Sequence, residues 1–154
     1  MAYDVEISEL SLKADLIEEA INFFWKHWGS ESNFNFYSDC ITHSLDQQNA
    51  LPKFYIGTIG DKIVCSYALL TNDIISRQDL MPWFACLYVD ESYRNQGIAA
   101  SLLVDGLLQA KAKGYKRLYL STDLVDFYEK NGWEQYGVGY GTSGDEFKIY
   151  SKET

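Results

Sequence analysis

The chain has 154 residues, of which 47% are hydrophobic, so it is long enough to fold as one globular domain. Its 22 acidic residues outnumber its 13 basic residues and give a net charge of −9. This balance argues against a nucleic-acid-binding protein, because such proteins carry a basic face. The longest apolar run, residues 83–89, is too short to cross a bilayer, and the acidic N-terminus has no signal-peptide pattern. We therefore expect a single cytoplasmic domain over residues 1–154, with no membrane and no nucleic acid as partner.

The cysteines and histidines do not form a metal-binding pattern. Cys40, Cys65 and Cys86 are widely separated, lie in apolar surroundings and include no CxxC pair. This usage is typical of free thiols in a reducing compartment. No Cys/His cluster with zinc-binding spacing includes His27 or His43, so we expect no metal ion at the functional site.

The first part of the chain predicts one strand followed by two helices. Apolar residues alternate with polar ones over residues 5–12, as in a strand. They then recur at helical spacing over residues 16–28, where Gly29 can end the helix. A weaker helical pattern runs through residues 37–45.

Three strands are expected next. Two of them, residues 53–59 and 62–70, flank the dipeptide Gly60-Asp61, which is a strong hairpin signal because glycine readily adopts a positive φ. The third, residues 81–89, is almost continuously apolar and is expected to be buried on both faces.

The second half of the chain begins with a long amphipathic helix from Ile98 to a stop at Gly114. A strand, a short helix and two strands joined by a Gly/Ser-rich turn follow, at residues 116–121, 123–131, 134–140 and 146–151. This order mixes hairpins with crossovers. It predicts an α/β domain of the α+β type, with a mixed, mainly antiparallel sheet of six to seven strands and helices on both faces.

The turn after the third apolar strand carries the clearest chemical signal. Residues 94–99 read Arg-Asn-Gln-Gly-Ile-Ala and lead from a strand into the long helix. Successive N–H groups at such a turn, together with the partial positive charge of the helix N-terminus, suit a pyrophosphate. Gly97 lets the backbone approach the phosphates, and Arg94 adds a charged donor. The alternative is an ordinary polar turn that caps an amphipathic helix.

A second motif stands about thirty residues downstream, where Phe127 and Tyr128 are followed by Gly132 and Trp133. With both motifs in place, the chain resembles the GNAT superfamily of acetyl-CoA-dependent N-acetyltransferases over nearly its whole length. Arg94, Gly97 and Ala99 match the family's pyrophosphate motif. Phe127, Tyr128 and Gly132 match the second motif, with Trp133 in place of its last aromatic residue.

The resemblance implies that acetyl-CoA is the cosubstrate and binds between two splayed strands. A bulge in the strand ending at Val89 would free the backbone of Leu87 and Val89 for the pantetheine amides. The pyrophosphate would be held by Arg94, Asn95, Gln96, Gly97, Ile98 and Ala99. Tyr128 matches the family's general acid, which protonates the departing CoA thiolate. The alternative for Tyr128 is a core aromatic residue beside Phe127.

Two departures from the family pattern leave the general base unassigned. Many members carry a glutamate on the fourth strand, where this chain has Trp83, and residues 83–89 contain no carboxylate. Ser121 and Thr122 stand where members often have an asparagine. Deprotonating a lysine-like amine at neutral pH costs about 4.6 kcal/mol, against about 1.4 for an α-amino group, so a site without a strong base tolerates weakly basic amines better. Asp79 is the nearest carboxylate for a water relay, unless it is only a solvated loop charge.

The expected function is therefore transfer of an acetyl group from acetyl-CoA to a primary amine of a small molecule or peptide, by direct attack in a ternary complex. The alternative is a catalytically weak acyl-CoA-binding or interaction module on the same fold. His27 could line an acceptor pocket, but a histidine on the helix surface is the simpler interpretation. The aromatic residues Trp25, Trp28, Tyr37 and Trp83 could form a box for a cationic amine, but core packing explains aromatic residues at helical spacing more simply. The Gly-rich hairpin at residues 141–144 could support a homodimer.

Overall fold

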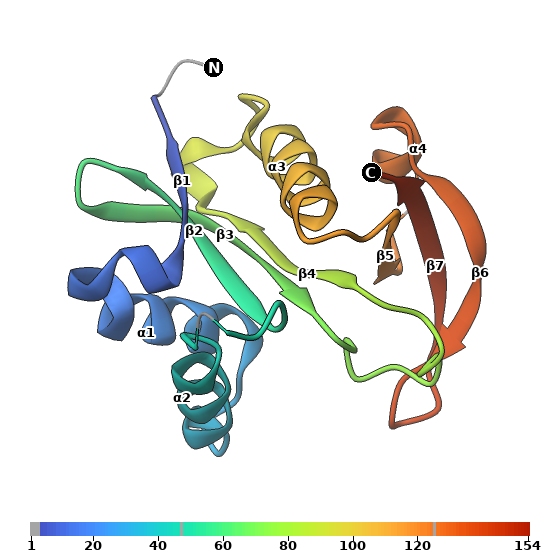
Figure 1. The fold of residues 1–154 in the computed structure, drawn as a ribbon, viewed down its shortest axis with the longest axis horizontal. Coiled ribbons are helices and arrows are strands. Elements are labelled where there is room, and N and C mark those ends of the chain that lie inside the picture. The colour runs from blue at the N-terminus through green and yellow to red at the C-terminus, as the bar shows by residue number, and fades with distance from the viewer. Residues whose placement is uncertain (1–3, 47, 125) are drawn as a thin grey trace.

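The computed structural model describes residues 4–46, 48–124 and 126–154. In these ranges seven strands form one sheet in the order β1-β2-β3-β4-β5-β7-β6, and β4–β5 is its parallel pair (Figure 1). The strands are β1 (Glu6–Glu9), β2 (Lys53–Ile59), β3 (Lys62–Leu70), β4 (Trp83–Val89), β5 (Arg117–Thr122), β6 (Glu134–Tyr140) and β7 (Glu146–Glu153). The α-helices are α1 (Ile17–Trp28), α2 (Phe34–His43), α3 (Ile98–Ala112) and α4 (Phe127–Lys130). The predicted mixed, mainly antiparallel sheet is confirmed.

The helices cover both faces of the sheet and bury two cores. Helices α1 and α2 pack on one face, where Phe24 and Ile41 meet Phe54 and Ile56 of β2 (Figure 1). Helix α3 and the short α4 lie on the opposite face, over a core that includes Phe84 of β4. Strands buried between two helical layers are apolar on both faces, which explains the long apolar runs of β2 and β3.

The strand and helix boundaries follow the predicted pattern, with differences at several ends. Helix α2 covers Phe34–His43 instead of residues 37–45, and β4 begins at Trp83 instead of residue 81. The first strand stops at Glu9 because residues 10–12 turn into a 3-10 helix that buries Leu10. The short helix begins only at Phe127, after a left-handed residue at Asp126. The apolar third strand is fully buried only as far as Ala85, and its next three residues are half-buried.

A bulge in β4 explains this partial exposure. Cys86 and Leu87 lie between the paired positions Ser66↔Tyr88 and Ala68↔Ala85, so β4 has an extra residue there. Cys86 takes a positive φ of 56°, and its carbonyl accepts a hydrogen bond from Ser66 Oγ at 3.0 Å. Strands β4 and β5 pair at Trp83↔Tyr119 and then diverge. The predicted bulge and splayed strands are thus both present.

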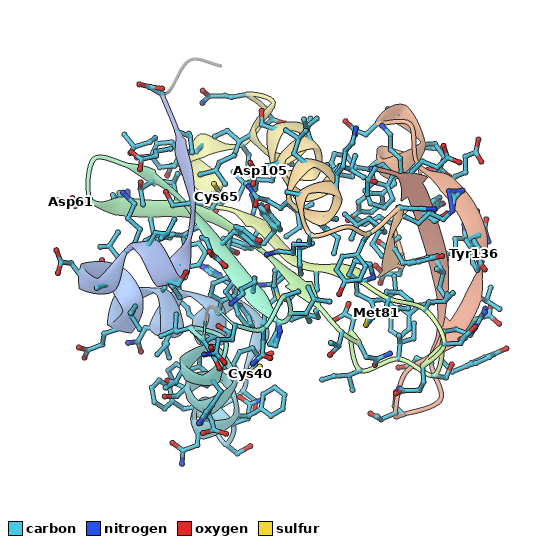
Figure 2. All side chains as sticks on the ribbon, in the orientation of Figure 1. Cys40, Asp61, Cys65, Met81, Asp105 and Tyr136 are labelled. Carbon is cyan, nitrogen blue, oxygen red and sulfur yellow. The ribbon has the colours of Figure 1, made fainter. Side chains whose placement is uncertain are left out.

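The three cysteines are free thiols, and Cys40 on α2 lies far from Cys65 on β3 (Figure 2). Among the described residues, no group of His, Cys, Asp and Glu side chains could hold a metal ion. None of the described helices is both long enough and apolar enough to span a membrane.

Helix α3 approaches the sheet closely at Gly106. A Cβ atom there would lie 2.6 Å from the Phe84 ring, which stacks on Tyr67 with centroids 4.8 Å apart. We expect Gly106→Ala to destabilise the protein by about 1–3 kcal/mol through overpacking, although alanine favours helices. Thermal unfolding measures this as a lower Tm. Val104→Ala, at an exposed position of α3, is the control and should leave Tm nearly unchanged; an unchanged Tm for Gly106→Ala would contradict the tight contact.

Candidate active site

The turn before α3 has the geometry of an anion cradle. Asn95 and Gly97 both take left-handed conformations, with φ of 64° and 80°, and the helix begins at Ile98. The N–H groups of a first helical turn have no acceptor within the helix, and they point outward from its N-terminus. A Cβ atom at Gly97 would meet no other atom within 4 Å. The space in front of the helix N-terminus is therefore open to a ligand.

A cavity of about 440 Å³ adjoins this turn, and we call it the α3 cavity. It extends from the bulged end of β4 to α4. The predicted cofactor residues that line it are Leu87, Val89, Arg94, Asn95, Gly97, Ile98 and Ala99. The side-chain Oε1 of Gln96, the remaining one, is buried without a partner among the described residues. The structure thus brings the sequence motif and the end of β4 to a single cavity.

Arg94 ties the turn to the end of β4. Its Nε donates to the carbonyl of Val89 at 2.8 Å, and its guanidinium lies 5.3 Å from the Tyr88 ring centroid. His27 of α1 stacks on the same ring at 3.6 Å. Burial lowers the pKa of His27, and the positive charges of Lys26 and Arg94 lower it further. His27 is not among the described residues that line this cavity or the one described next, so the structure does not favour the acceptor-pocket alternative for it.

A second cavity, of about 620 Å³, lies where β4 and β5 diverge, and we call it the Asp73 cavity. It is bounded by α1, α2, the segment after β3 and the turn between β6 and β7. Among the residues that the structure describes, three line both cavities: Leu87, Leu124 and Tyr128. Tyr128 is therefore placed where the two cavities meet.

The Tyr128 side chain is held in position by its aromatic neighbours. It is only 8% exposed, and its ring centroid lies 4.9 Å from that of Phe127 and 5.8 Å from that of Tyr150. Burial raises the pKa of the Tyr128 phenol to about 12, against a smaller lowering by the Thr122 side chain. At neutral pH the group is consequently a phenol with a proton to donate.

Asp73, which the sequence reasoning missed, is the half-buried carboxylate of the second cavity. Burial raises the pKa of Asp73 to about 7, while interaction with the Ser121 side chain acts in the opposite direction. Asp79, the carboxylate considered from the sequence, is an exposed residue that forms an ion pair with Arg77 at 2.8 Å. Arg77 lowers the pKa of Asp79, so this residue is a solvated loop charge rather than a proton acceptor.

The aromatic residues considered for an acceptor pocket separate into two groups. Trp28 and Tyr37 line the Asp73 cavity. Trp83 is buried in the core, where its Nε1 donates to the Leu80 carbonyl at 2.7 Å, and Trp25 donates to the Ser30 carbonyl at 2.8 Å. Trp25 and Trp83 are therefore structural, as the core-packing alternative expects, whereas Trp28 and Tyr37 lie at a cavity.

Cys86 also lines the Asp73 cavity. Burial raises the pKa of its thiol, and the negative charge of Asp73 raises it further. A thiolate is the reactive form of cysteine, so this environment makes Cys86 a poor nucleophile.

Several solved structures have the same fold. An acetyltransferase of the GNAT family from Desulfovibrio desulfuricans superposes with a TM-score of 0.71 at 16% identity, covering 97% of this chain and 99% of that one. An aminoglycoside 6'-acetyltransferase type Ii has a TM-score of 0.70 at 18% identity, covering 96% of each chain. A PaiA N-acetyltransferase from Thermoplasma acidophilum, in complex with coenzyme A, has a TM-score of 0.65 at 20% identity, covering 98% of this chain and 99% of that one.

Sequence comparison assigns the family. No curated protein sequence matches the chain. The profile of the acetyltransferase (GNAT) domain matches residues 50–135, which span β2 to the start of β6 and include both motifs. This match covers more than half of the chain, and the solved GNAT structure described above has the same fold. The chain belongs to the GNAT acetyltransferase family and is an enzyme of the acyltransferase class.

Proposed function

We propose that the protein transfers the acetyl group of acetyl-CoA to a primary amine, which attacks the thioester directly in a ternary complex. The observation that carries this proposal is the meeting of the α3 cavity and the Asp73 cavity at Tyr128. Two substrates bound in these cavities would approach each other at a protonated phenol. The complex of the Thermoplasma acidophilum neighbour with coenzyme A supports the choice of cosubstrate.

The α3 cavity fits acetyl-CoA. The open turn at Gly97 and the N–H groups at the start of α3 would hold the pyrophosphate. The bulge at Cys86 and Leu87 and the divergence of β4 from β5 leave backbone near Leu87 for the pantetheine amides. The Val89 carbonyl already accepts the hydrogen bond from Arg94, so the backbone contribution proposed for Val89 is limited to its N–H group. Bound acetyl-CoA supplies the activated acetyl thioester, and the chain's own residues orient it.

Tyr128 would act on the leaving group. As the bond between carbon and sulfur breaks, the phenol donates a hydrogen bond and then its proton to the sulfur. The raised Tyr128 pKa of about 12 keeps the proton on the phenol until the thiolate develops. It also makes the phenol a weaker acid than a thiol with the usual pKa of about 8.5, so the hydrogen bond to the developing thiolate is the larger part of its role and the proton follows as the thiolate leaves. Cys86 is no alternative acetyl carrier, because burial keeps it a thiol.

Calorimetry with acetyl-CoA tests the cosubstrate assignment. We expect Arg94→Ala to weaken binding by about tenfold or more, because it removes a charged donor and the hydrogen bond that fixes the turn to Val89. Arg117→Ala, at the start of β5, removes the same kind of charge outside the α3 cavity and is the control. Equal affinities of wild type and Arg94→Ala would exclude the proposed role of Arg94.

The alternative is an acyl-CoA-binding module without efficient catalysis, and the absence of a carboxylate from β4 favours it. A panel of amines distinguishes the two, with free thiol released from acetyl-CoA as the signal. Binding of acetyl-CoA with no thiol release across the panel would support the binding module.

We also propose that residues 1–154 form one GNAT domain. The segments outside residues 50–135 are integral to the sheet: β1 pairs with β2, and β7 lies between β5 and β6.

We propose in addition a homodimer through the β6–β7 region, since β6 is an edge strand with Tyr136 and Tyr140 exposed. Sedimentation measures the assembly state.

A further inference from the structure

The Asp73 cavity carries negative charge and no positive charge. The carboxylates among its described lining residues are those of Asp73, which is half-buried, and Asp123, which is exposed. Among the described residues that line it there is no Lys, Arg or His. The net charge of −9 adds a field that attracts cations. A ligand of this cavity is therefore expected to carry a positive charge.

Aromatic side chains complete the environment of a cation. Trp28 at the end of α1 and Tyr37 of α2 line the same cavity, and the Tyr37 hydroxyl donates to the Trp28 carbonyl at 2.9 Å. This bond fixes the two helix segments relative to each other. Aromatic faces attract ammonium groups, and the volume of about 620 Å³ is in the range of small-molecule sites.

We infer that Asp73 binds the ammonium group of the acceptor and takes its proton, so that the acceptor is a small molecule with a cationic primary amine. The inference rests on the proposed acetyl transfer. Asp73 lies in the cavity on the acceptor side of Tyr128, so an amine held by its carboxylate faces the thioester. It supplies the proton acceptor that β4 lacks.

The protons balance in this scheme. The ammonium nitrogen gives its first proton to the Asp73 carboxylate and becomes a neutral amine. Its lone pair forms the bond to the acetyl carbon, the bond between carbon and sulfur breaks, and the sulfur gains a proton from Tyr128. The nitrogen loses its second proton to the medium as the amide forms, and the phenol recovers one from the medium. Asp73 then releases its proton, so the net products are the amide, the CoA thiol and one proton.

The ionisation of Asp73 makes acceptor binding depend on pH. The titratable groups that share its cavity are Tyr37 of α2, Cys86 of β4, Asp123 after β5 and Tyr128 of α4. Burial raises the pKa values of Tyr37, Cys86 and Tyr128, which are therefore uncharged at neutral pH. Asp73, with its pKa raised to about 7, is neutral below that pH and a carboxylate above it. Binding of a cation should therefore strengthen as the pH rises.

The test uses the full-length protein saturated with CoA, which carries no acetyl group, so that binding is measured without reaction. The probes are cyclohexylamine, a cation at neutral pH, and aniline, a neutral amine of similar size. Calorimetry should show that cyclohexylamine binds at least about tenfold more tightly than aniline to the wild type. Its affinity should increase from about pH 6 to about pH 8.

Asp73→Asn should lose both the preference for the cation and the pH dependence, whereas Asp73→Glu should retain part of both. The matched control is Asp79→Asn, which removes the same charge from the same loop outside the cavity and should behave like the wild type. An unchanged pH dependence in Asp73→Asn would overturn the inference. An equal loss of affinity for cyclohexylamine and aniline in Asp73→Asn would show that Asp73 has only a structural role, and it would overturn the inference as well.

Turnover provides the second measurement. With acetyl-CoA, Asp73→Asn should lower kcat/KM for cyclohexylamine by about 100-fold or more and affect aniline much less, because aniline has no proton to lose before it attacks. If the wild type released no thiol with any amine, the proposed acetyl transfer would be wrong. The binding measurements would still decide whether Asp73 holds a cation. If the wild type did not bind cyclohexylamine more tightly than aniline, the proposed role of Asp73 would be wrong even if the enzyme turned over.

Discussion

Replacing Tyr128 with Phe is expected to lower kcat by about 10- to 1000-fold and to change the affinity for acetyl-CoA little. The variant keeps the ring that contacts Phe127 and Tyr150 and removes only the hydroxyl at the junction of the two cavities. Because burial raises the pKa of Tyr128 to about 12, the lost group is a proton donor at neutral pH. Thiol release at saturating acetyl-CoA measures kcat, and calorimetry measures the affinity.

Two variants separate this effect from other causes. Tyr150→Phe removes a hydroxyl that donates to Glu129 at 2.7 Å, outside both cavities, and should leave kcat nearly unchanged. Cys86→Ala should leave turnover mostly intact, since the thiol takes no part in direct transfer. Trapping an acetylated Cys86 in the absence of amine would contradict the direct mechanism. An unchanged kcat in Tyr128→Phe would remove Tyr128 from the acid role.

The α3 side of the site was predictable because its parts are nearly contiguous in the chain. Residues 94–99 form a single turn, and the physical reasons for an anion site there are local: glycine at a positive φ and a helix N-terminus. The bulge at Cys86 could be predicted only from the family resemblance, because no residue pattern in the strand indicates it. Strand boundaries at β2, β3 and β6 agreed with the predicted ranges, since each has clear turn residues at its ends.

The Asp73 cavity could not be predicted from the sequence. Trp28, Tyr37 and Asp73 come from three separate segments, and they line one cavity only because β4 and β5 diverge after a single paired position. The family pattern places a carboxylate on β4, but Trp83 there is buried in the core, and Asp79, just before the strand, pairs with Arg77 in solvent. Closeness to β4 along the chain does not identify the carboxylate of the cavity. Asp73 follows the neighbouring strand β3 and reaches the cavity from there.

Replacing Gly97 with Val is expected to lower the affinity for acetyl-CoA by more than about 100-fold. Gly97 has a φ of 80°, which a β-branched residue adopts only with strain, so the turn would refold and its N–H groups would lose their common direction. The valine side chain would also project into the open space before the helix N-terminus, where a Cβ atom now meets nothing within 4 Å. Calorimetry measures the loss.

Gly114→Val is the matched control for this prediction. Gly114 follows the other end of α3 and has a φ of 92°, and a Cβ atom there also meets nothing within 4 Å. Both variants therefore impose the same kind of backbone strain on α3 and should lower Tm by similar amounts. Only Gly97→Val changes the α3 cavity, so Gly114→Val should bind acetyl-CoA with nearly wild-type affinity. Wild-type affinity in Gly97→Val, or an equal loss in both variants, would show that the pyrophosphate is not held at the turn before α3.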